Sequence, residues 1–257
     1  MDRVMTPLSA GLLAFFATGG GTLLGLCIAS RLPEHHLAEQ TSRAVSVGMA
    51  VVGSLTALVL GLLVSNASNA FNTQSGEIET IAVNILKLDR QLRAYGALAE
   101  PIRVELAGYA RAKVQELSNP GDGPSMGLET LHRLEAVSGA VLGLSPGSER
   151  ERAIHARVVS LTDQIEDTRW LLAERTAAMV VPTSVLIMLI GWLALLFASF
   201  GMFAPRNATA MTFLMLSAAA IAGCIFIILA LGSPGGGGFV DPSVEPIIRV
   251  VAQMQIE

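Results

Sequence analysis

Four long stretches of this 257-residue chain carry no charged side chain, and they constrain the fold more than any other feature. The first stretch contains the apolar segment Leu8 to Ser30, which is long enough to cross a hydrocarbon core of roughly 30 Å at 1.5 Å per residue. A cleavable signal peptide would have a shorter apolar region, of about 7 to 15 residues. We therefore predict a membrane-spanning helix here.

The other three stretches predict three further spans, at residues 45–64, 177–203 and 211–231. Pro182, near the start of the third segment, predicts a kink where the preceding helix enters the bilayer. Charged residues make up only 15% of the chain, against about a quarter in soluble domains, and the mean hydropathy is +0.56. The sequence therefore predicts a four-span integral membrane protein.

An even number of spans places both termini on one side of the membrane, together with the long segment between spans two and three. Basic residues near the membrane favour the cytoplasm for that side. They are Arg3, Arg157, Arg169, Arg175 and Arg249, against Arg31, Arg43 and Arg206 on the other side, an excess of 5 − 3 = 2. We expect both termini and the insertion to be cytoplasmic.

The chain divides into four parts. Residues 1–64 hold spans one and two, 65–176 form the insertion, 177–231 hold spans three and four, and 232–257 form a Gly-rich turn and a short amphipathic tail. The insertion carries 12 of the 17 basic and 15 of the 21 acidic residues, which indicates a solvated surface of mixed charge.

The insertion is predicted to be helical. One helix follows Pro101 and runs to Leu117, a Pro/Gly-rich loop covers residues 118–124, and a short helix occupies residues 128–142. Ser148 and Glu151 have the spacing of a capping box and start the last helix. Its apolar residues recur at three- and four-residue steps and predict one packed face: Ile154, Val158, Leu161, Ile165 and Leu172. Without strand-like alternation anywhere, the fold class is all-α.

Several classes of function are disfavoured. No Asp, Glu, Lys, Arg or His lies in the four apolar segments, where proton relays and transporters of charged substrates place ionisable groups. The net charge of −4, without clustered basic residues, argues against nucleic-acid binding. Catalytic motifs are absent, and Cys27 and Cys224 lie in apolar runs without metal-ligand spacing. We therefore predict no enzyme, no catalytic residue, no metal site and no cofactor.

Small residues recur in the spans, including Gly21 and Gly25 at GxxxG spacing, and they predict close contacts between helices. Three stretches of the chain resemble the bestrophin-like membrane proteins of bacteria: Val59 to Phe71, Glu79 to Tyr109 and Phe200 to Asn207. The last is the most specific, and its motif residues are Gly201, Pro205, Arg206 and Asn207. The resemblance covers nearly the whole chain.

The resemblance implies a likeness to bestrophins, which are pentameric anion channels whose second span lines a narrow apolar neck. The neck positions carried over are Ser54, Leu58 and Leu62, which lie at i, i+4 and i+8 on one helix face and could form stacked rings around a symmetry axis. Asn66 and Phe71 would lie just below the neck and line a vestibule; a polar cluster that bends or packs the helix is the alternative.

The leading hypothesis is a passive ion channel, most simply for anions, in the inner membrane of a bacterium. Its partners would be the lipid bilayer, small inorganic ions and further copies of the chain, with a pentamer implied by the resemblance. The alternative is a membrane-anchored interaction or sensory module that does not conduct. A channel needs Ser54, Leu58 and Leu62 to face an open axis, whereas an anchor needs that face buried against helices.

Overall fold

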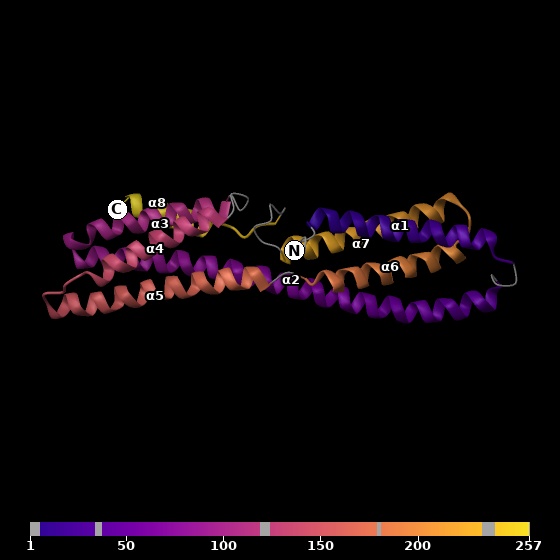
Figure 1. Ribbon diagram of the computed structural model, residues 1–257, viewed down its shortest axis with the longest axis horizontal. Helices are drawn as coiled ribbons and strands as arrows, with labels where there is room; N and C mark the ends of the chain where they lie inside the picture. Colours follow the sequence, from indigo (N-terminus) through magenta and orange to yellow (C-terminus); the bar gives the residue numbers. More distant parts are fainter. Residues whose placement is uncertain (1–5, 34–37, 119–123, 179–180, 233–239, 257) are drawn as a thin grey trace. The chain divides into compact units, whose positions relative to one another are not determined.

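The computed structural model describes residues 6–33, 38–118, 124–178, 181–232 and 240–256, and every regular element in these ranges is a helix (Figure 1). The all-α prediction is therefore confirmed for the described residues. Four helices are long and apolar enough to cross a membrane, as predicted: α1 (Pro7–Arg31), α2 (Glu39–Tyr95), α6 (Thr183–Phe203) and α7 (Ala208–Gly232).

The chain forms two compact units. The membrane unit consists of Met1–Ala70 with Val180–Ser233, and the insertion unit consists of Phe71–Met179 with Pro234–Glu257. Helix α2, at 57 residues, belongs to both, because it continues through the polar residues 65–69 without interruption. Neither glycine nor proline lies in that polar stretch, so nothing in it breaks the backbone hydrogen-bond ladder.

Small residues let α1 approach α6 closely in the membrane unit. A Cβ on Gly21 would overlap the carbonyl oxygen of Ala194, and a Cβ on Gly25 would overlap that of Ala198. The predicted GxxxG contact is therefore made inside one protomer. From the first pair to the second, the residue number rises by four in both helices, so α1 and α6 run parallel. The first and third of four consecutive spans must do so.

The two remaining spans run the other way. In α1, Gly11 faces Phe226 and Gly19 faces Met215 of α7, which makes these two helices antiparallel. In α2, Gly53 faces Leu196 of α6, and Leu63, further along α2, packs against the core that contains Leu186, nearer the start of α6, so these two helices are antiparallel as well. The core of the unit contains mostly leucine, isoleucine and alanine: Ala10, Ala14, Leu186, Leu189, Ile190, Leu193, Ala222, Ile225 and Leu229.

Pro182 separates two helices and does not kink one, so the predicted kink is corrected. Helix α5 (Glu149–Ala178) ends before it, and Pro182 is the N-cap residue of α6, which begins at Thr183. Proline has no N–H to donate, but its carbonyl accepts hydrogen bonds from Val185 and Leu186 at 3.0 and 3.3 Å. The third span therefore starts as a new helix.

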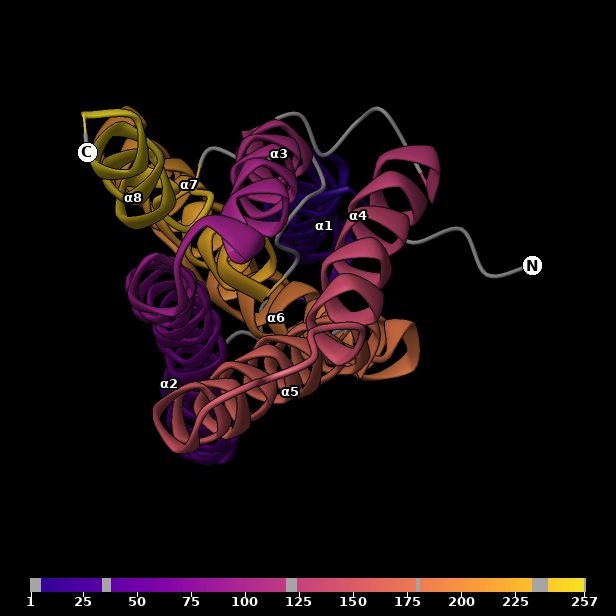
Figure 2. The same ribbon diagram turned by 90° about the vertical axis from the view of Figure 1, so that its left-hand side faces the viewer.

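The insertion unit is a bundle of the C-terminal part of α2 with α3 (Glu100–Ser118), α4 (Pro124–Leu142), α5 and α8 (Glu245–Ile256). Gly96 ends α2 with a φ of 110°, a value that side chains disfavour, and the short 3₁₀ helix η2 (Ala97–Ala99) leads into α3. Figure 2 shows this unit end-on, with α3 between α4 and α8.

Helix α5 has the N-terminal cap and the apolar face that the sequence predicts. The Ser148 hydroxyl oxygen accepts the N–H of Glu151 at 3.2 Å, and the Glu151 carboxylate accepts the N–H of Gly147 at 2.7 Å. The predicted cap is thus formed, with the glutamate reaching one residue further back than in the usual capping box. Val158, Leu161, Ile165 and Leu172 are buried and Ile154 packs against the core, which confirms the predicted apolar face.

Two loops that the sequence predicts are only partly described. Most of the Pro/Gly-rich loop predicted at 118–124, and most of the predicted Gly-rich turn after residue 232, lie outside the described residues. Helix α8 occupies the predicted amphipathic tail, and Ile247 and Val250 place its apolar face in the core of the insertion unit. The chain after span four therefore returns to the same core as α3.

Candidate functional site

Helix α2 has one packed face and one uncovered face within the membrane unit. Thr56 and Ala67 are buried. On the same side, Val59, Leu60 and Leu63 pack against the core of the unit, and Val52 packs against a smaller cluster of Leu196, Phe197 and Ala218. Only 6% of its most apolar window is buried, against 39% in α1, 39% in α6 and 28% in α7. Of the four spans, α2 is thus the least covered by its own protomer.

The three predicted neck residues lie on this uncovered face. Leu58 and Leu62 expose 70% and 60% of their surface, and Ser54 is also exposed. The Ser54 hydroxyl donates to the carbonyl of Ala50 at 2.8 Å, so its hydrogen is already used by the helix backbone. The protomer therefore exposes Leu58, Leu62 and Ser54 along one stripe of α2, and the hydroxyl of Ser54 is hydrogen-bonded within the helix.

The two predicted vestibule residues, Asn66 and Phe71, lie on different sides of α2. Asn66 is exposed and continues the stripe one turn beyond Leu62, whereas Phe71 is half-buried. Five residues rotate an α-helix by about 500°, so these two side chains point about 140° apart. The Phe71 carbonyl accepts the hydroxyl of Ser75 at 3.0 Å, which is a local contact within α2. Only Asn66 shares the exposed face with the neck residues.

Further polar residues follow Asn66 on the exposed side of α2. Asn69, Asn72 and Thr73 are all exposed, and Asn69 lies seven residues after Leu62, which is two helical turns on the same face. Sequence reasoning singled out Asn66 but not these three. The signal that could have found them is the same helical period, extended past the end of the apolar segment.

The residues of the Phe200 to Asn207 motif mainly build the turn between α6 and α7. Gly201 allows α6 to touch the Thr22 carbonyl of α1, because any Cβ there would overlap that oxygen. Ala204, before Pro205, is extended and ends α6. The Asn207 side chain accepts the N–H of Ala210 at 2.8 Å and so caps α7. Arg206 is exposed and has no such structural contact among the described residues.

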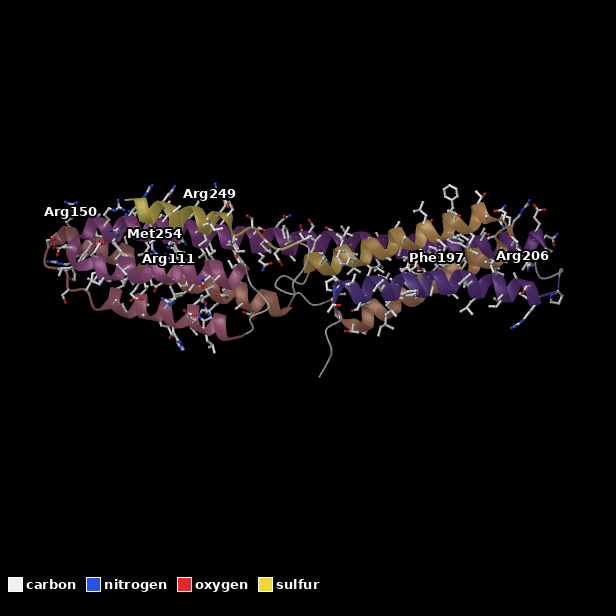
Figure 3. All side chains as sticks on the ribbon, turned by 90° about the horizontal axis from the view of Figure 1, so that it is seen from above. Arg111, Arg150, Phe197, Arg206, Arg249 and Met254 are labelled. Atoms are coloured by element: carbon white, nitrogen blue, oxygen red, sulfur yellow. The ribbon has the colours of Figure 1, made fainter. Side chains whose placement is uncertain are left out.

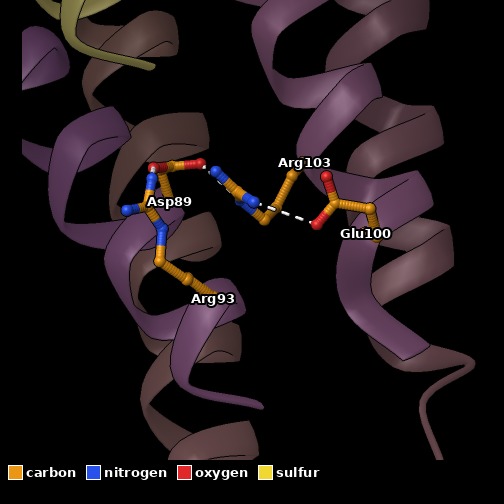
Figure 4. A network of polar contacts seen from close by, with 4 residues as sticks. All are labelled: Asp89, Arg93, Glu100 and Arg103. Carbon is orange, nitrogen blue, oxygen red and sulfur yellow. Dashed lines mark hydrogen bonds and ion pairs between the residues drawn. The ribbon is translucent and has the colours of Figure 1, made fainter. Parts of the chain in front are cut away.

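A buried ion pair joins α2 to α3 in the insertion unit (Figure 4). Asp89 is 2% exposed and accepts from Nε of Arg103 at 2.9 Å, while Arg103 Nη1 contacts Glu100 at 2.9 Å and Arg93 lies 3.6 Å from Asp89. The hydrogen bond to Asp89 raises the pKa of Arg103. Because its carboxylate contacts Arg93 of α2 and Arg103 of α3, Asp89 holds these two helices together.

A second polar cluster lies where α3, α4 and α5 meet. The ammonium group of Lys113 is buried and contacts Glu116 at 2.9 Å, and the same carboxylate accepts the Thr130 hydroxyl at 2.6 Å. Burial lowers the pKa of Lys113 in spite of Glu116. Tyr109 is fully buried beside this cluster without a hydrogen-bond partner for its hydroxyl, and burial raises its pKa.

The described residues offer no group of three or more His, Cys, Asp or Glu side chains arranged to hold a metal ion. Cys27 and Cys224 are free thiols; Cys27 is exposed and Cys224 is half-buried. The charged side chains that are buried, Asp89 and Lys113, are each paired with an opposite charge. The arrangement suits a bundle held by ion pairs and gives no convergent reactive constellation within that part of the chain.

Four bilayer-length apolar helices define the chain as an integral membrane protein. The family model described as the Bestrophin-like domain matches residues 16–242, which include all four spans except the start of the first. The chain belongs to the bestrophin-like family. No curated protein and no solved structure gives a significant match. Membership relates the chain to bestrophins, which are ion channels and not enzymes.

Proposed function

We propose that the protein is a passive, anion-conducting channel formed by several copies of the chain around α2. The single observation that supports this most is the uncovered face of α2, on which Ser54, Leu58 and Leu62 share one stripe. Around a symmetry axis these positions would form stacked rings, and the two leucine rings would make an apolar constriction that gates by dewetting.

The residues beyond the neck are suited to anions. Asn66 and Asn69 carry amide N–H groups that can solvate an ion leaving the constriction. Further along α2, Lys87 and Arg90 are exposed and have no ion-pair partner among the described residues. These two side chains give the insertion unit positive charge, which raises the local concentration of anions. Family membership supports conduction itself.

The assembly and its orientation are part of the proposal. A pentamer agrees with the bestrophin likeness, and the exposed apolar residues Val51 and Leu55, beside the neck stripe on α2, give each protomer a surface for its neighbours. The location is the inner membrane of a bacterium, with the termini and the insertion unit in the cytoplasm. The antiparallel order of the four spans supports one common side for both termini and the insertion.

The test is ion flux through purified protein in liposomes, with chloride compared with potassium. Leu58→Ala combined with Leu62→Ala should raise chloride flux, because smaller rings lower the dewetting barrier. The matched control is Leu23→Ala with Leu216→Ala, two leucines of α1 and α7 that are 55% and 63% exposed. Equal flux in the neck variant, the control and the wild type, all correctly inserted, would contradict the proposed neck.

The second candidate is a membrane-anchored interaction module. Large apolar side chains exposed on the insertion unit favour it, among them Leu98, Val104, Leu142 and Trp170. This function predicts no flux from correctly assembled protein and a partner that protects these side chains. Selective flux would reject it, since an anchor requires no conducting path.

A further inference from the structure

Among the motif residues Gly201, Pro205, Arg206 and Asn207, Arg206 is the one whose side chain makes no recorded contact in the turn. It lies between α6 and α7, where Figure 3 labels it, and forms no hydrogen bond or ion pair among the described residues. A residue linking two spans lies at the depth of the lipid headgroups. An exposed guanidinium at that depth faces phosphate groups.

Two grooves meet beside Arg206 on the membrane unit. The first has a volume of about 380 Å³ and is lined by Arg206 together with Leu26, Pro205, Asn207, Ala208 and Met211. The second, of about 650 Å³, lies between α2, α6 and α7 and is lined by Met49, Gly53, Phe200, Phe203 and Phe213 among others. Ala204 and Leu214 line both grooves. Their walls are mainly apolar, with Ser42, Ser46 and Ser199 as polar residues of the second groove.

We propose that this surface binds one anionic glycerophospholipid of the bilayer, with its phosphate on Arg206 and one acyl chain in each groove. The two grooves suit a ligand with two apolar tails, because they share Ala204 and Leu214 while the first is also lined by Leu26 of α1 and the second by residues of α2. Both volumes lie within the range of ordinary ligand sites. Asn207 keeps its side-chain oxygen on the cap of α7, so Arg206 is the group that contacts the phosphate.

The charge of the membrane unit favours a lipid over a second copy of the chain as occupant. Among the residues described for this unit, Glu39 is the only acidic one, and it is paired with Arg43. The described residues of a neighbouring membrane unit therefore offer Arg206 no unpaired carboxylate, whereas a lipid phosphate brings a negative charge. The proposal is independent of conduction, because it uses neither the neck nor the vestibule.

The experiment is native mass spectrometry of the full-length protein after equilibration with equal amounts of phosphatidylglycerol and phosphatidylcholine. We expect the wild type to retain phosphatidylglycerol preferentially, with Arg206→Gln lowering that preference about fivefold. Arg206→Lys should keep most of the preference. The matched control is Arg31→Gln, because Arg31 is exposed at the end of α1 and lines neither groove.

A second pair of variants tests the grooves. Ala204→Leu fills both and should lower retention of both lipids, whereas Ala219→Leu, on the exposed side of α7 outside the grooves, should not. Equal retention of the two lipids by the wild type, or equal effects of Arg206→Gln and Arg31→Gln, would overturn the proposal. A third result would also overturn it: a wild type that binds no lipid, together with an Arg206→Gln variant that no longer forms the oligomer. That result would mean that a second copy of the chain covers the grooves.

Discussion

Gly201 of α6 and Thr22 of α1 touch through their backbones. A Cβ built on Gly201 would overlap the carbonyl oxygen of Thr22, while Gly191 on the same helix has open space around the equivalent position. Backbone cannot move aside as a flexible side chain can, so the α1 and α6 axes must separate to admit even one methyl group. This pair fixes the distance between spans one and three.

Gly201→Ala should therefore destabilise the membrane unit by about 1–3 kcal/mol, the usual cost of overpacking. Gly191→Ala is the control and should be neutral or slightly stabilising, because alanine favours a helix more than glycine does. Thermal unfolding of the full-length protein in detergent, followed by circular dichroism, measures both. Equal melting temperatures for the two variants would show that α1 and α6 can separate without cost.

The spans and most helix ends could be predicted because their signals are local. Uncharged stretches of bilayer length gave the four spans, and Ser148 with Glu151 marked the start of α5. Pro182 was wrongly interpreted as a kink because a proline alone does not show whether the helix resumes on the same axis. The neighbouring residues decide whether the helix continues. Here α5 ends at Ala178 and a new helix, α6, begins at Thr183.

The contacts between helices could not be predicted. Asp89 and Arg103 are 14 residues apart with a turn between them, and nothing in their spacing pairs them. The candidate site was predictable only in part: helical period placed Ser54, Leu58 and Leu62 on one face, and the same period separates Phe71 from that face. Which face of α2 is uncovered depends on how α6 packs against it, and sequence periodicity alone does not give that.

Asp89→Asn should destabilise the full-length protein by about 3 kcal/mol, because it leaves the buried end of Arg103 without its carboxylate. Urea unfolding in detergent measures the loss. The control is Glu129→Gln, which breaks an ion pair with Arg133 that is about half exposed and should change stability by less than about 1 kcal/mol. Equal losses of stability in the two variants would show that burial does not increase the contribution of the Asp89–Arg103 pair to the free energy of unfolding.

Tyr109→Phe should be neutral or stabilising at pH 7 by up to about 1 kcal/mol, because it removes a buried hydroxyl that has no hydrogen-bond partner. Burial raises the pKa of Tyr109 above its ordinary value of 10.0, so the folded state resists ionisation that the unfolded chain accepts. Tyr109 therefore adds no pH dependence well below pH 10.0, and the free energy of unfolding falls as the pH rises past that value, because the unfolded chain ionises there and the folded state does not.

The variant should remove this alkaline loss, which is at most about 1.4 kcal/mol per pH unit. Lys113 acts in the opposite sense, because its pKa is lowered and raising the pH towards 10.5 relieves the cost of its buried charge. Urea unfolding between pH 8 and 11 separates the two residues, with Lys113→Met as the comparison. A wild-type slope that persists in Tyr109→Phe would assign the alkaline loss to another group.

Ser54 offers the sharpest test of the α2 face. Its hydroxyl already donates to the Ala50 carbonyl at 2.8 Å, so Ser54→Ala removes little polarity from the proposed neck and should change chloride flux less than about twofold. Ser54→Leu adds a third bulky apolar ring above Leu58 and should lower flux about tenfold or more, because a longer dry constriction is harder to wet.

Thr212→Leu is the matched control for Ser54→Leu. Thr212 is an exposed residue of α7 whose hydroxyl donates to the Ala208 carbonyl at 2.9 Å, so the substitution makes the same change in chemistry on another span. Stopped-flow measurement of chloride efflux from liposomes, normalised to inserted protein, compares the three variants. Equal flux in Ser54→Leu and Thr212→Leu would mean that ions do not pass along this face of α2.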